Sequence, residues 1–345
     1  MTNFASDNVT GVSPEIMDAL VSANNDHATM SYGADRWTDS LSSKVAEIFE
    51  TDVTVFPVIS GTAANVLPIS SLTPAYGSIY CHKEAHINVD ECGASEFYTG
   101  GAKLVPLAGD HGKFSVTALE NAIFGRGVPR HAQPALVSLT QTTEAGTLYQ
   151  PEEIAAITEV ARKNDLKVHM DGARFANAVV GTGCSAADLT WRSGVDVLSF
   201  GATKNGAMGA ELVVFFGTPN VKELENRRVR GGHFISKMRF LSAQLAAYLD
   251  NDLWRRNAQQ ANDMAQRMTN FLSNIPKIEF IHPVEANILF MTMPKGMVVA
   301  LKEAGFEFYE MLPGEERSLV RLVMSFNSKQ SDVDRFAEIA KQYRA

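Results

Sequence analysis

LKVHMDGARFANAVVGTGCSAADLTWRSGVDVLSFGATKNGAM, residues 166–208, is the stretch that decides the fold of this chain. An apolar run, Leu166 to Met170, ends at Asp171, and a segment of helical composition follows. A second apolar run, Val195 to Phe200, then stops shortly before Lys204. A strand, a crossover and a strand of this length form one βαβ unit. Since ligands of open parallel sheets bind beyond the carboxyl ends of the strands, we expect Asp171 and Lys204 to lie side by side at such an edge.

An acid and a lysine in these positions suit pyridoxal phosphate. The lysine forms a Schiff base with this cofactor, and the acid pairs with its pyridinium nitrogen. The alternative is a surface salt bridge after two strands, and the spacing alone leaves both interpretations open.

Composition narrows the class of protein. The chain has 345 residues, 45% of them apolar and 20% charged, which is typical of a globular protein with one large core and a smaller domain. A net charge of -8 without a long basic run argues against a nucleic-acid partner. The cysteines (Cys81, Cys92 and Cys184) are odd in number and widely spread, which favours the reducing cytoplasm over a disulfide framework. No run approaches the ~20 apolar residues of a membrane span, and the first residues do not resemble a signal peptide.

Strand and helix patterns alternate up to Lys204, which is typical of a mainly parallel α/β sheet. Glu211 to Phe216 is predicted to add an antiparallel strand, and the pattern is then helical from Asn220 to Asn274. We therefore predict a large α/β domain with an N-terminal arm at residues 1–250 and a small α+β domain at residues 251–345.

Two local predictions concern helices. His86 to Phe97 is predicted to be helical. Ser331 and Asp334 are predicted to form a capping box at the start of the last helix.

Ser60-Gly61-Thr62 lies where a strand passes into a helix. Backbone N–H groups and the helix dipole can hold a phosphate there, and Gly61 would let the backbone approach it closely. The alternative is a plain tight turn with Thr62 as the N-cap.

Cys81, His82, Glu84 and His86 form the densest cluster of possible metal ligands in the sequence. The pattern is not H-E-x-x-H and no third distant ligand is evident, so we expect no metal here. Ring stacking or proton transfer by one of the histidines is the favoured role.

Two arginines are candidates for binding an anionic substrate group. Arg174 follows Asp171 closely, and Arg321 is a charge within the apolar run SLVRLVMSF, where it needs a partner. A substrate carboxylate would serve either one, because a guanidinium can bind it bidentately. The alternative for each is an internal ion pair with an Asp or Glu.

A further basic cluster contains Arg227, Arg228, Arg230, Lys237 and Arg239. It can be a solvated helix face. A subunit contact, or a phosphate ligand supplied across a dimer, is the other interpretation.

Several motifs occur in a fixed order: S-D-N-V-T, S-G-T-A-A-N, A-H-I-N-V-D-E-C-G-A, H-M-D-G-A-R, S-F-G-A-T-K-N-G and S-K-M-R-F-L-S-A-Q. Together they resemble the L-threonine aldolases of the β-eliminating lyase group, which are fold-type I pyridoxal-phosphate enzymes. The similarity covers essentially the whole chain and points to the branch of low-specificity bacterial threonine aldolases and phenylserine aldolase. D-G-A-R followed by S-F-x-x-T-K is its most specific part.

The resemblance implies a role for each matching residue. Lys204 would form the Schiff base, Asp171 would pair with the pyridine nitrogen, and His86 would stack on the cofactor ring. The remaining implied contacts are the phosphate ligands Ser60, Gly61, Thr62 and Thr203, and the substrate-binding residues Ser6, Tyr32, Arg174 and Arg321. Arg174 would also approach the cofactor, and Tyr32 would come from the neighbouring subunit of a homodimer or homotetramer.

The sequence departs from the family where it reads Q-T-T-E-A-G, since many threonine aldolases carry a histidine in this stretch. Here the residue is Glu144, which leaves open the group that handles the β-hydroxyl proton. The implied activity is cleavage of L-threonine, L-allo-threonine or phenylserine to glycine and an aldehyde. Another fold-type I enzyme, such as an aminotransferase, and a non-catalytic binding protein on the same fold are the alternatives.

Overall fold

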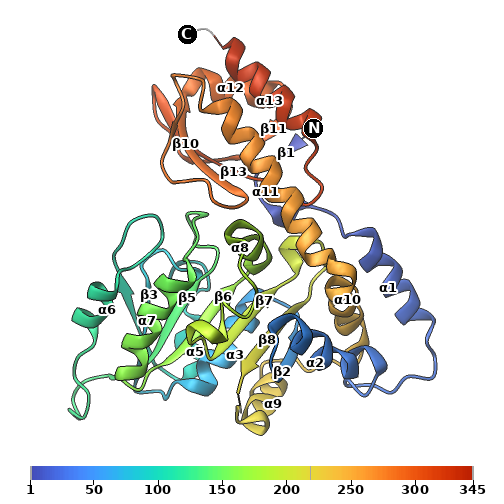
Figure 1. Cartoon of the computed structure of the whole chain (residues 1–345), viewed down its shortest axis with the longest axis vertical. Helices are drawn as coiled ribbons and strands as arrows, with labels where there is room; N and C mark the ends of the chain where they lie inside the picture. Colours follow the sequence, from blue (N-terminus) through green and yellow to red (C-terminus); the bar gives the residue numbers. More distant parts are fainter. Residues whose placement is uncertain (1, 218, 344–345) are drawn as a thin grey trace.

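The structure, a computed structural model, describes residues 2–217 and 219–343. Figure 1 shows a wide α/β body below and a smaller body above, joined by helix α11 (Leu253–Leu272), which runs from one into the other. Among the described residues, no helix is both long and apolar enough to cross a membrane.

The wide body is built on a sheet with strand order β2-β8-β7-β6-β5-β3-β4. Strands from β7 to β4 pair in parallel, while β8 runs antiparallel to β7 and β2. The mainly parallel sheet and the antiparallel strand after Lys204 are thus confirmed. The strands are β2 (Val53–Val58), β3 (Gly77–His82), β4 (Lys103–Leu107), β5 (Gln133–Thr140), β6 (Lys167–Gly172), β7 (Val197–Gly201) and β8 (Glu211–Phe216).

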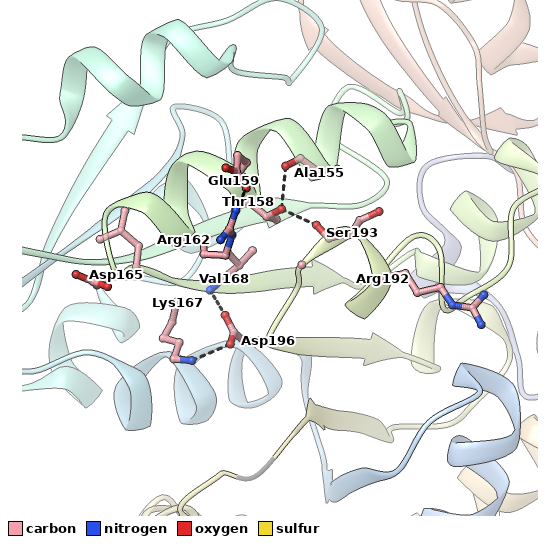
Figure 2. Close-up of a pocket in the computed structure, with 12 residues that line it drawn as sticks. Ala155, Thr158, Glu159, Arg162, Asp165, Lys167, Val168, Arg192, Ser193 and Asp196 are labelled. Carbon is pink, nitrogen blue, oxygen red and sulfur yellow. Dashed lines mark hydrogen bonds and ion pairs between the residues drawn. The ribbon is translucent and has the colours of Figure 1, made fainter.

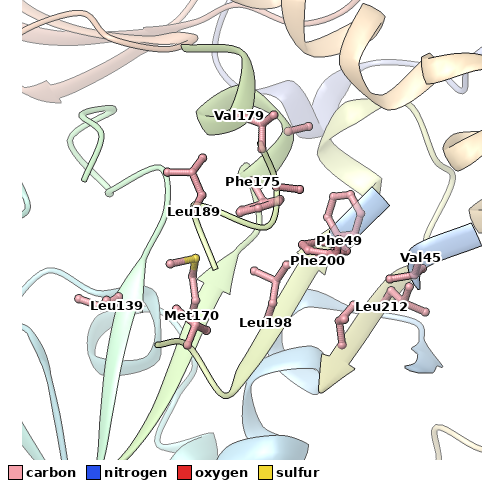
Figure 3. Packing of buried hydrophobic residues seen from close by; sticks show 14 of the residues in the cluster. Val45, Phe49, Leu139, Met170, Phe175, Val179, Leu189, Leu198, Phe200 and Leu212 are labelled. Carbon is pink, nitrogen blue, oxygen red and sulfur yellow. The ribbon is translucent and has the colours of Figure 1, made fainter. Parts of the chain in front are cut away.

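One face of this sheet carries the main apolar core. Successive side chains of a strand point to opposite faces, so Met170 of β6 and Leu198 and Phe200 of β7 share this face. Figure 3 shows them packed with Phe49 and Phe175. The rings of Phe49 and Phe175 lie edge-on to Phe200 at centroid distances of 5.9 and 5.6 Å.

The opposite face carries a polar column beneath helix α3 (Gly61–Leu72). His169 of β6 is fully buried and hydrogen-bonds through its two ring nitrogens to the hydroxyls of Ser138 and Ser199, each at 2.9 Å. Burial lowers the pKa of His169 to about 4, so the ring is neutral at physiological pH. Asp171, two residues further along β6, faces the same side and ends the column at the sheet edge.

Helices cover both faces of the sheet. The core of the apolar face includes side chains of α1 (Pro14–Asn25), α2 (Arg36–Phe49), α6 (Val116–Ala122), α7 (Pro151–Lys163), α8 (Phe175–Thr182) and α10 (Arg239–Leu249). The other face is covered by α3, with α5 (Ala94–Thr99) and α9 (Val221–Arg230) packed against it.

The smaller body has an antiparallel sheet in the order β12-β13-β10-β9. Its elements are β9 (Glu279–Phe280), β10 (Ile288–Pro294), α12 (Lys295–Glu303), β12 (Tyr309–Leu312), β13 (Arg317–Val323) and α13 (Gln330–Gln342). Helix α11 contributes Leu253 and Trp254 to the main core, and Met268 and Leu272 to the core of the smaller body. The domain boundary at residues 250 and 251 stays a prediction.

The first residues of the N-terminal arm pack against the smaller body. Strand β1 (Thr2–Asn3) pairs in parallel with β11 (Phe306–Glu307). Phe4 is buried against the rings of Phe306 and Phe336, at centroid distances of 5.9 and 6.0 Å. The arm then crosses to the wide body as the 3-10 turn η1 (Asp7–Val9), which lies against η3 (Thr203–Asn205).

Both local helix predictions need correction. The segment from His86 to Phe97 forms two short helices, α4 (His86–Val89) and α5, because Cys92 and Gly93 adopt left-handed backbone angles, with φ of 52° and 72°. The capping box is wrong as well. Helix α13 begins at Gln330, so Ser331 lies inside its first turn, and the Asp334 carboxylate accepts from Arg267 of α11 instead.

Phe200→Ala should strongly destabilise the protein, because its ring fills the centre of an aromatic cluster and its loss leaves a cavity. We expect a loss of about 3–5 kcal/mol in the free energy of unfolding, measured by urea denaturation of the apoprotein. Phe124→Ala is the control, since that side chain is 65% exposed and its loss should cost less than about 0.5 kcal/mol. Equal shifts for both variants would contradict this assignment of the core.

Candidate active site

A cavity lies where the carboxyl ends of β5 and β6 and the turn after β7 meet the first turns of α3 and α4. The residues that line it are Gly61, Asn65, His86, Thr140, Thr142, Glu144, Asp171, Ala173, Arg174 and Lys204. The structure therefore brings Asp171 and Lys204 together, as predicted from the βαβ unit.

Asp171 is held by two donors. Its Oδ1 accepts from the backbone N–H of Ala173 at 3.0 Å, and its Oδ2 accepts from the side-chain amide of Asn65 at 2.9 Å. The same Asn65 nitrogen donates to Glu91 at 2.9 Å, and Nδ1 of His86 lies 2.7 Å from that Glu91 oxygen. Asp171 and His86 are thus fixed by one connected network.

Glu91 sets the state of His86. The hydrogen bond to the fully buried Glu91 side chain raises the pKa of His86 and requires the proton on Nδ1, because a carboxylate can only accept. Nε2 is then the free nitrogen of the neutral ring. Since His86 lines the cavity and its side chain is 34% exposed, this nitrogen is available to a ligand.

Lys204 is placed by the turn η3 that follows β7. Asn205 donates to the Tyr248 hydroxyl and to the Trp254 carbonyl, both at 2.8 Å, which anchors the turn to the core. Ahead of the lysine, the Thr203 hydroxyl donates to the Ala210 carbonyl at 3.3 Å. The position of the lysine backbone is therefore fixed on both sides.

The first turn of α3 is suited to an anion. Ser60 is the N-cap, since its hydroxyl accepts from the Ala63 N–H at 3.2 Å, so the alternative with Thr62 as N-cap is wrong. A Cβ built on Gly61 would meet nothing within 4 Å. The glycine thus leaves open space beside the first N–H groups of the helix, which have no acceptor within the helix itself.

Arg174 forms an internal ion pair with Asp7 of the N-terminal arm. Its Nε and Nη2 donate to the two Asp7 oxygens at 2.7 and 2.9 Å. Burial alone would raise the pKa of Asp7, but Arg174, Lys204 and Asn287 together outweigh it and the pKa is lowered, so Asp7 remains ionised. The internal-pair alternative therefore holds for Arg174, although this residue also lines the cavity.

Arg321 lacks such a counterion. Its Nη2 donates to the Ala5 carbonyl at 3.1 Å, and its guanidinium lies 4.9 Å from the Tyr309 ring centroid. Its Nε is buried without a hydrogen-bond partner, and none of the described carboxylates is within ion-pairing distance. Burial, and then the positive charge of Arg174, lowers the pKa of Arg321. This arrangement favours the prediction that Arg321 awaits an external anion.

Glu144 lines the cavity without a hydrogen-bond partner among the described residues. Burial, and then the Asp171 carboxylate, raises its pKa, although its side chain still faces the open space. A carboxyl with this environment can exchange a proton at higher pH than an ordinary glutamate.

Other predicted residues lie outside the lining of this cavity. The Ser6 hydroxyl accepts from the Asn8 N–H at 3.1 Å at the start of η1, next to Asp7. Tyr32 is 53% exposed and stacks on Phe234 at a centroid distance of 5.3 Å. Its contribution to a neighbouring subunit stays a prediction.

The possible metal ligands near His86 have separate environments. Cys81 is buried in an apolar cluster, and His82 hydrogen-bonds to the Gly109 carbonyl at 3.2 Å and to the Glu84 N–H at 3.2 Å. No group of three metal-ligating side chains occurs within the part of the chain that the structure describes.

Sequence reasoning missed Asp7, Asn65 and Glu91. Each lies in one of the quoted motifs, and Asn65 interrupts the apolar run of a buried helix. A fully buried amide needs partners, so the polar residue in an apolar run is the signal that could have identified Asn65. Asp7 and Glu91 stand in polar stretches that give no such signal.

A larger hollow lies at the opposite edge of the sheet (Figure 2). Its polar groups are occupied by the protein itself: Asp196 accepts from the Val168 N–H and from Lys167, and the Thr158 hydroxyl donates to the Ser193 carbonyl. It lies at the amino-terminal ends of β6 and β7, where open parallel sheets do not bind their ligands.

The architecture places the chain among the fold-type I pyridoxal-phosphate enzymes. The serine palmitoyltransferase of Sphingomonas wittichii shares the fold with a TM-score of 0.72 and 16% identity, covering 98% of this chain and 86% of that chain. A threonine aldolase from Leishmania major superposes with a TM-score of 0.92 and 26% identity, covering 99% of both chains. The predicted fold class is confirmed.

Comparison of sequences identifies the family. The family model "Beta-eliminating lyase" matches residues 3–295, and the chain belongs to this family. A low specificity L-threonine aldolase from a Pseudomonas species is 38% identical over 342 residues, covering 99% of this chain and 97% of the relative. The predicted family resemblance is confirmed.

Glu144→Gln should change how stability depends on pH. A carboxyl whose pKa is raised by folding stabilises the folded state while it is protonated, and this stability is lost as pH rises from the ordinary value of 4.5 towards the raised value. The glutamine keeps that stability, so the melting temperature of the variant apoprotein should increasingly exceed that of the wild type as pH rises above 4.5. Glu152→Gln, at an exposed position of α7, is the control. A difference that shrinks with rising pH would refute the assignment.

Proposed function

We propose that this chain is a pyridoxal-phosphate-dependent aldehyde-lyase of the threonine aldolase type. It would cleave L-threonine, L-allo-threonine or related β-hydroxy-α-amino acids such as phenylserine to glycine and an aldehyde. The observation that carries the proposal is the meeting of Lys204 and Asp171 in one cavity, in a chain 38% identical to a low specificity L-threonine aldolase along nearly its whole length.

The residues of the cavity fit the cofactor. Lys204 offers the amine for its covalent attachment, Asp171 the carboxylate for its pyridine nitrogen, and His86 a ring for stacking. The open space beside Gly61 suits the phosphate, with Ser60, Thr62 and Thr203 as its further ligands. When bound, pyridoxal phosphate takes up the electrons of a bond that breaks at the α-carbon of an attached amino acid.

The protein's own groups bind the substrate and move its protons. Arg321, assisted by Arg174 and Ser6, would hold the α-carboxylate and so fix the orientation of the bond to be broken. Nε2 of His86 and the carboxylate of Glu144 are the candidates for taking the β-hydroxyl proton. The Nδ1–H bond to Glu91 makes Nε2 an acceptor in the neutral ring, and the raised pKa makes the Glu144 carboxylate a stronger base than an ordinary glutamate.

The proposal includes a homodimer or homotetramer in the cytoplasm, with Tyr32 reaching the site of a neighbouring subunit. Apolar side chains exposed on the single chain support subunit contact, among them Met17, Val21, Met30 and Phe234. The proposed domains are residues 1–250, which carry the cofactor, and residues 251–345.

The wild-type enzyme should release acetaldehyde and glycine from L-threonine, and Lys204→Ala should abolish both this turnover and the visible absorbance of the attached cofactor. Glycine and aldehyde are quantified for L-threonine, L-allo-threonine and L-phenylserine, with and without a 2-oxo acid. Amino transfer to the 2-oxo acid without aldehyde release would establish an aminotransferase instead. A lysine-bound cofactor without any turnover would establish the binding-protein alternative.

Arg321→Ala should raise KM for all these substrates alike, because the α-carboxylate is common to them. The lost charge-assisted contact should lower kcat/KM by a factor that corresponds to about 2–4 kcal/mol of transition-state binding free energy. Arg321→Lys should recover part of this, since lysine lacks the bidentate geometry.

Arg317→Ala, on the same strand, is the matched control, because Arg317 contacts Thr292 and Glu279 at the surface. An unchanged KM together with a lowered melting temperature would show that Arg321 is only structural.

A further inference from the structure

Asp7 connects the N-terminal arm with both bodies of the molecule. It is 2% exposed, it takes the Arg174 guanidinium with both oxygens, and its Oδ2 also accepts from the Asn287 amide of the smaller body at 3.1 Å. A carboxylate this deeply buried is costly unless it is fully paired. Its place beside the cavity therefore calls for an explanation beyond the anchoring of a flexible end.

The pair with Asp7 determines which edge of Arg174 a ligand can use. A guanidinium can bind a carboxylate through Nε and one terminal nitrogen, or through its two terminal nitrogens. Asp7 occupies the first of these edges, since it accepts from Nε and Nη2. The edge formed by Nη1 and the outer N–H of Nη2 is the one left for a second carboxylate.

The same arm also contacts Arg321. The Ala5 carbonyl accepts from Arg321, and the Phe4 carbonyl accepts from the Val323 N–H of the same strand β13. Residues 4–7 thus hold both arginines, one through the backbone and one through a side chain, and fix their relative placement.

The positive charges of Arg174 and Arg321 explain why an acidic residue occupies position 7. Arg174 is bound by Asp7 and Arg321 by the Ala5 carbonyl two residues earlier, so one short stretch of the arm holds both positive charges beside the Asp7 carboxylate. Two guanidinium groups and one carboxylate have a net charge of +1, which matches a single α-carboxylate. Without Asp7 the same two arginines would have a net charge of +2, which matches a dianion.

We propose that Asp7 is a positioning and specificity-determining residue, which presents Arg174 by its terminal edge and restricts the arginine pair to monocarboxylate ligands. The inference rests on the proposed function in so far as the natural ligand is an amino acid. The inference predicts that the site prefers to bind a ligand with one carboxylate over a ligand with two. This binding preference can be measured on the apoprotein without turnover.

The test compares acetate with malonate as probes of the apoprotein by thermal shift, from which dissociation constants follow. In Asp7→Asn the affinity for malonate relative to acetate should rise at least about tenfold over the wild type, because the site gains one positive charge. Asp334→Asn is the matched control. Asp334 accepts two hydrogen bonds from the Nε and Nη2 of Arg267, which is the same geometry, but the pair lies away from the cavity. An unchanged ratio in Asp7→Asn would overturn the proposal and leave Asp7 a structural anchor.

A second pair of variants keeps the test decisive if Asp7→Asn does not fold. Arg174→Gln lowers the net charge of the group to zero, and the double variant Asp7→Asn/Arg174→Gln returns it to +1 without leaving the Asp7 carboxylate unpaired. The double variant should bind acetate about tenfold more tightly than Arg174→Gln. Equal affinities would overturn the proposal.

Turnover separates this inference from the proposed function. If the wild type cleaves L-threonine, the Asp7→Asn variant should show a raised KM for L-threonine. Its preference should shift towards β-hydroxyaspartate, which carries a second carboxylate. A wild type inactive on every β-hydroxy-α-amino acid would refute the proposed function, while the anion measurements would still decide the role of Asp7.

Discussion

A carboxylate buried at the end of a parallel strand needs hydrogen-bond donors, and the need of Asp171 explains much of this structure. The strand that carries it alternates between the apolar core and a polar column, so Asp171 faces α3 rather than the core. Helix α3 supplies one of these donors, the side-chain amide of Asn65, which stands within an apolar stretch. Because Asn65 also donates to Glu91, the position of His86 is tied to the same carboxylate. Four side chains from three separate parts of the sequence are therefore fixed by one requirement.

The second organising feature is the distribution of positive charge. Lys204 and Arg174 line the cavity from a turn and a helix start, and Arg321 of the other body is tied to the same N-terminal arm as Arg174. Such a concentration of like charge is unfavourable in the empty protein, and buried acids moderate it. Asp7 is the acid with the closest contact, and its low exposure means that water contributes little to screening the pair. The positive groups of the site are thus preorganised for binding an anion.

The sequence predicts the parts of this arrangement that follow from a repeated pattern. Alternating strands and helices predict the sheet, and the ends of β6 and β7 predict that Asp171 and Lys204 converge. The family motifs predict the involvement of His86, Gly61 and Arg321. The contacts of Asp7 could not be predicted in the same way, because its partners Arg174 and Asn287 are distant in sequence and meet it only after the arm has crossed between the bodies. The division of the segment after His86 into two helices was missed for a local reason, since the left-handed backbone at Cys92 is adopted by a residue type that rarely takes it.

The packing of Phe4 against Phe306 and Phe336 has a consequence for how the chain acquires its shape. Residues 2–4 find their partners in β11 and α13, which follow them in the chain by about 300 residues. The wide sheet can begin to assemble during synthesis, whereas the start of the arm cannot dock until β11 has been made. Contacts between the two ends of a chain also carry the greatest loop-closure entropy and form late. A nascent chain interrupted before β11 would thus present a formed sheet and an arm that still lacks its partners in the smaller body.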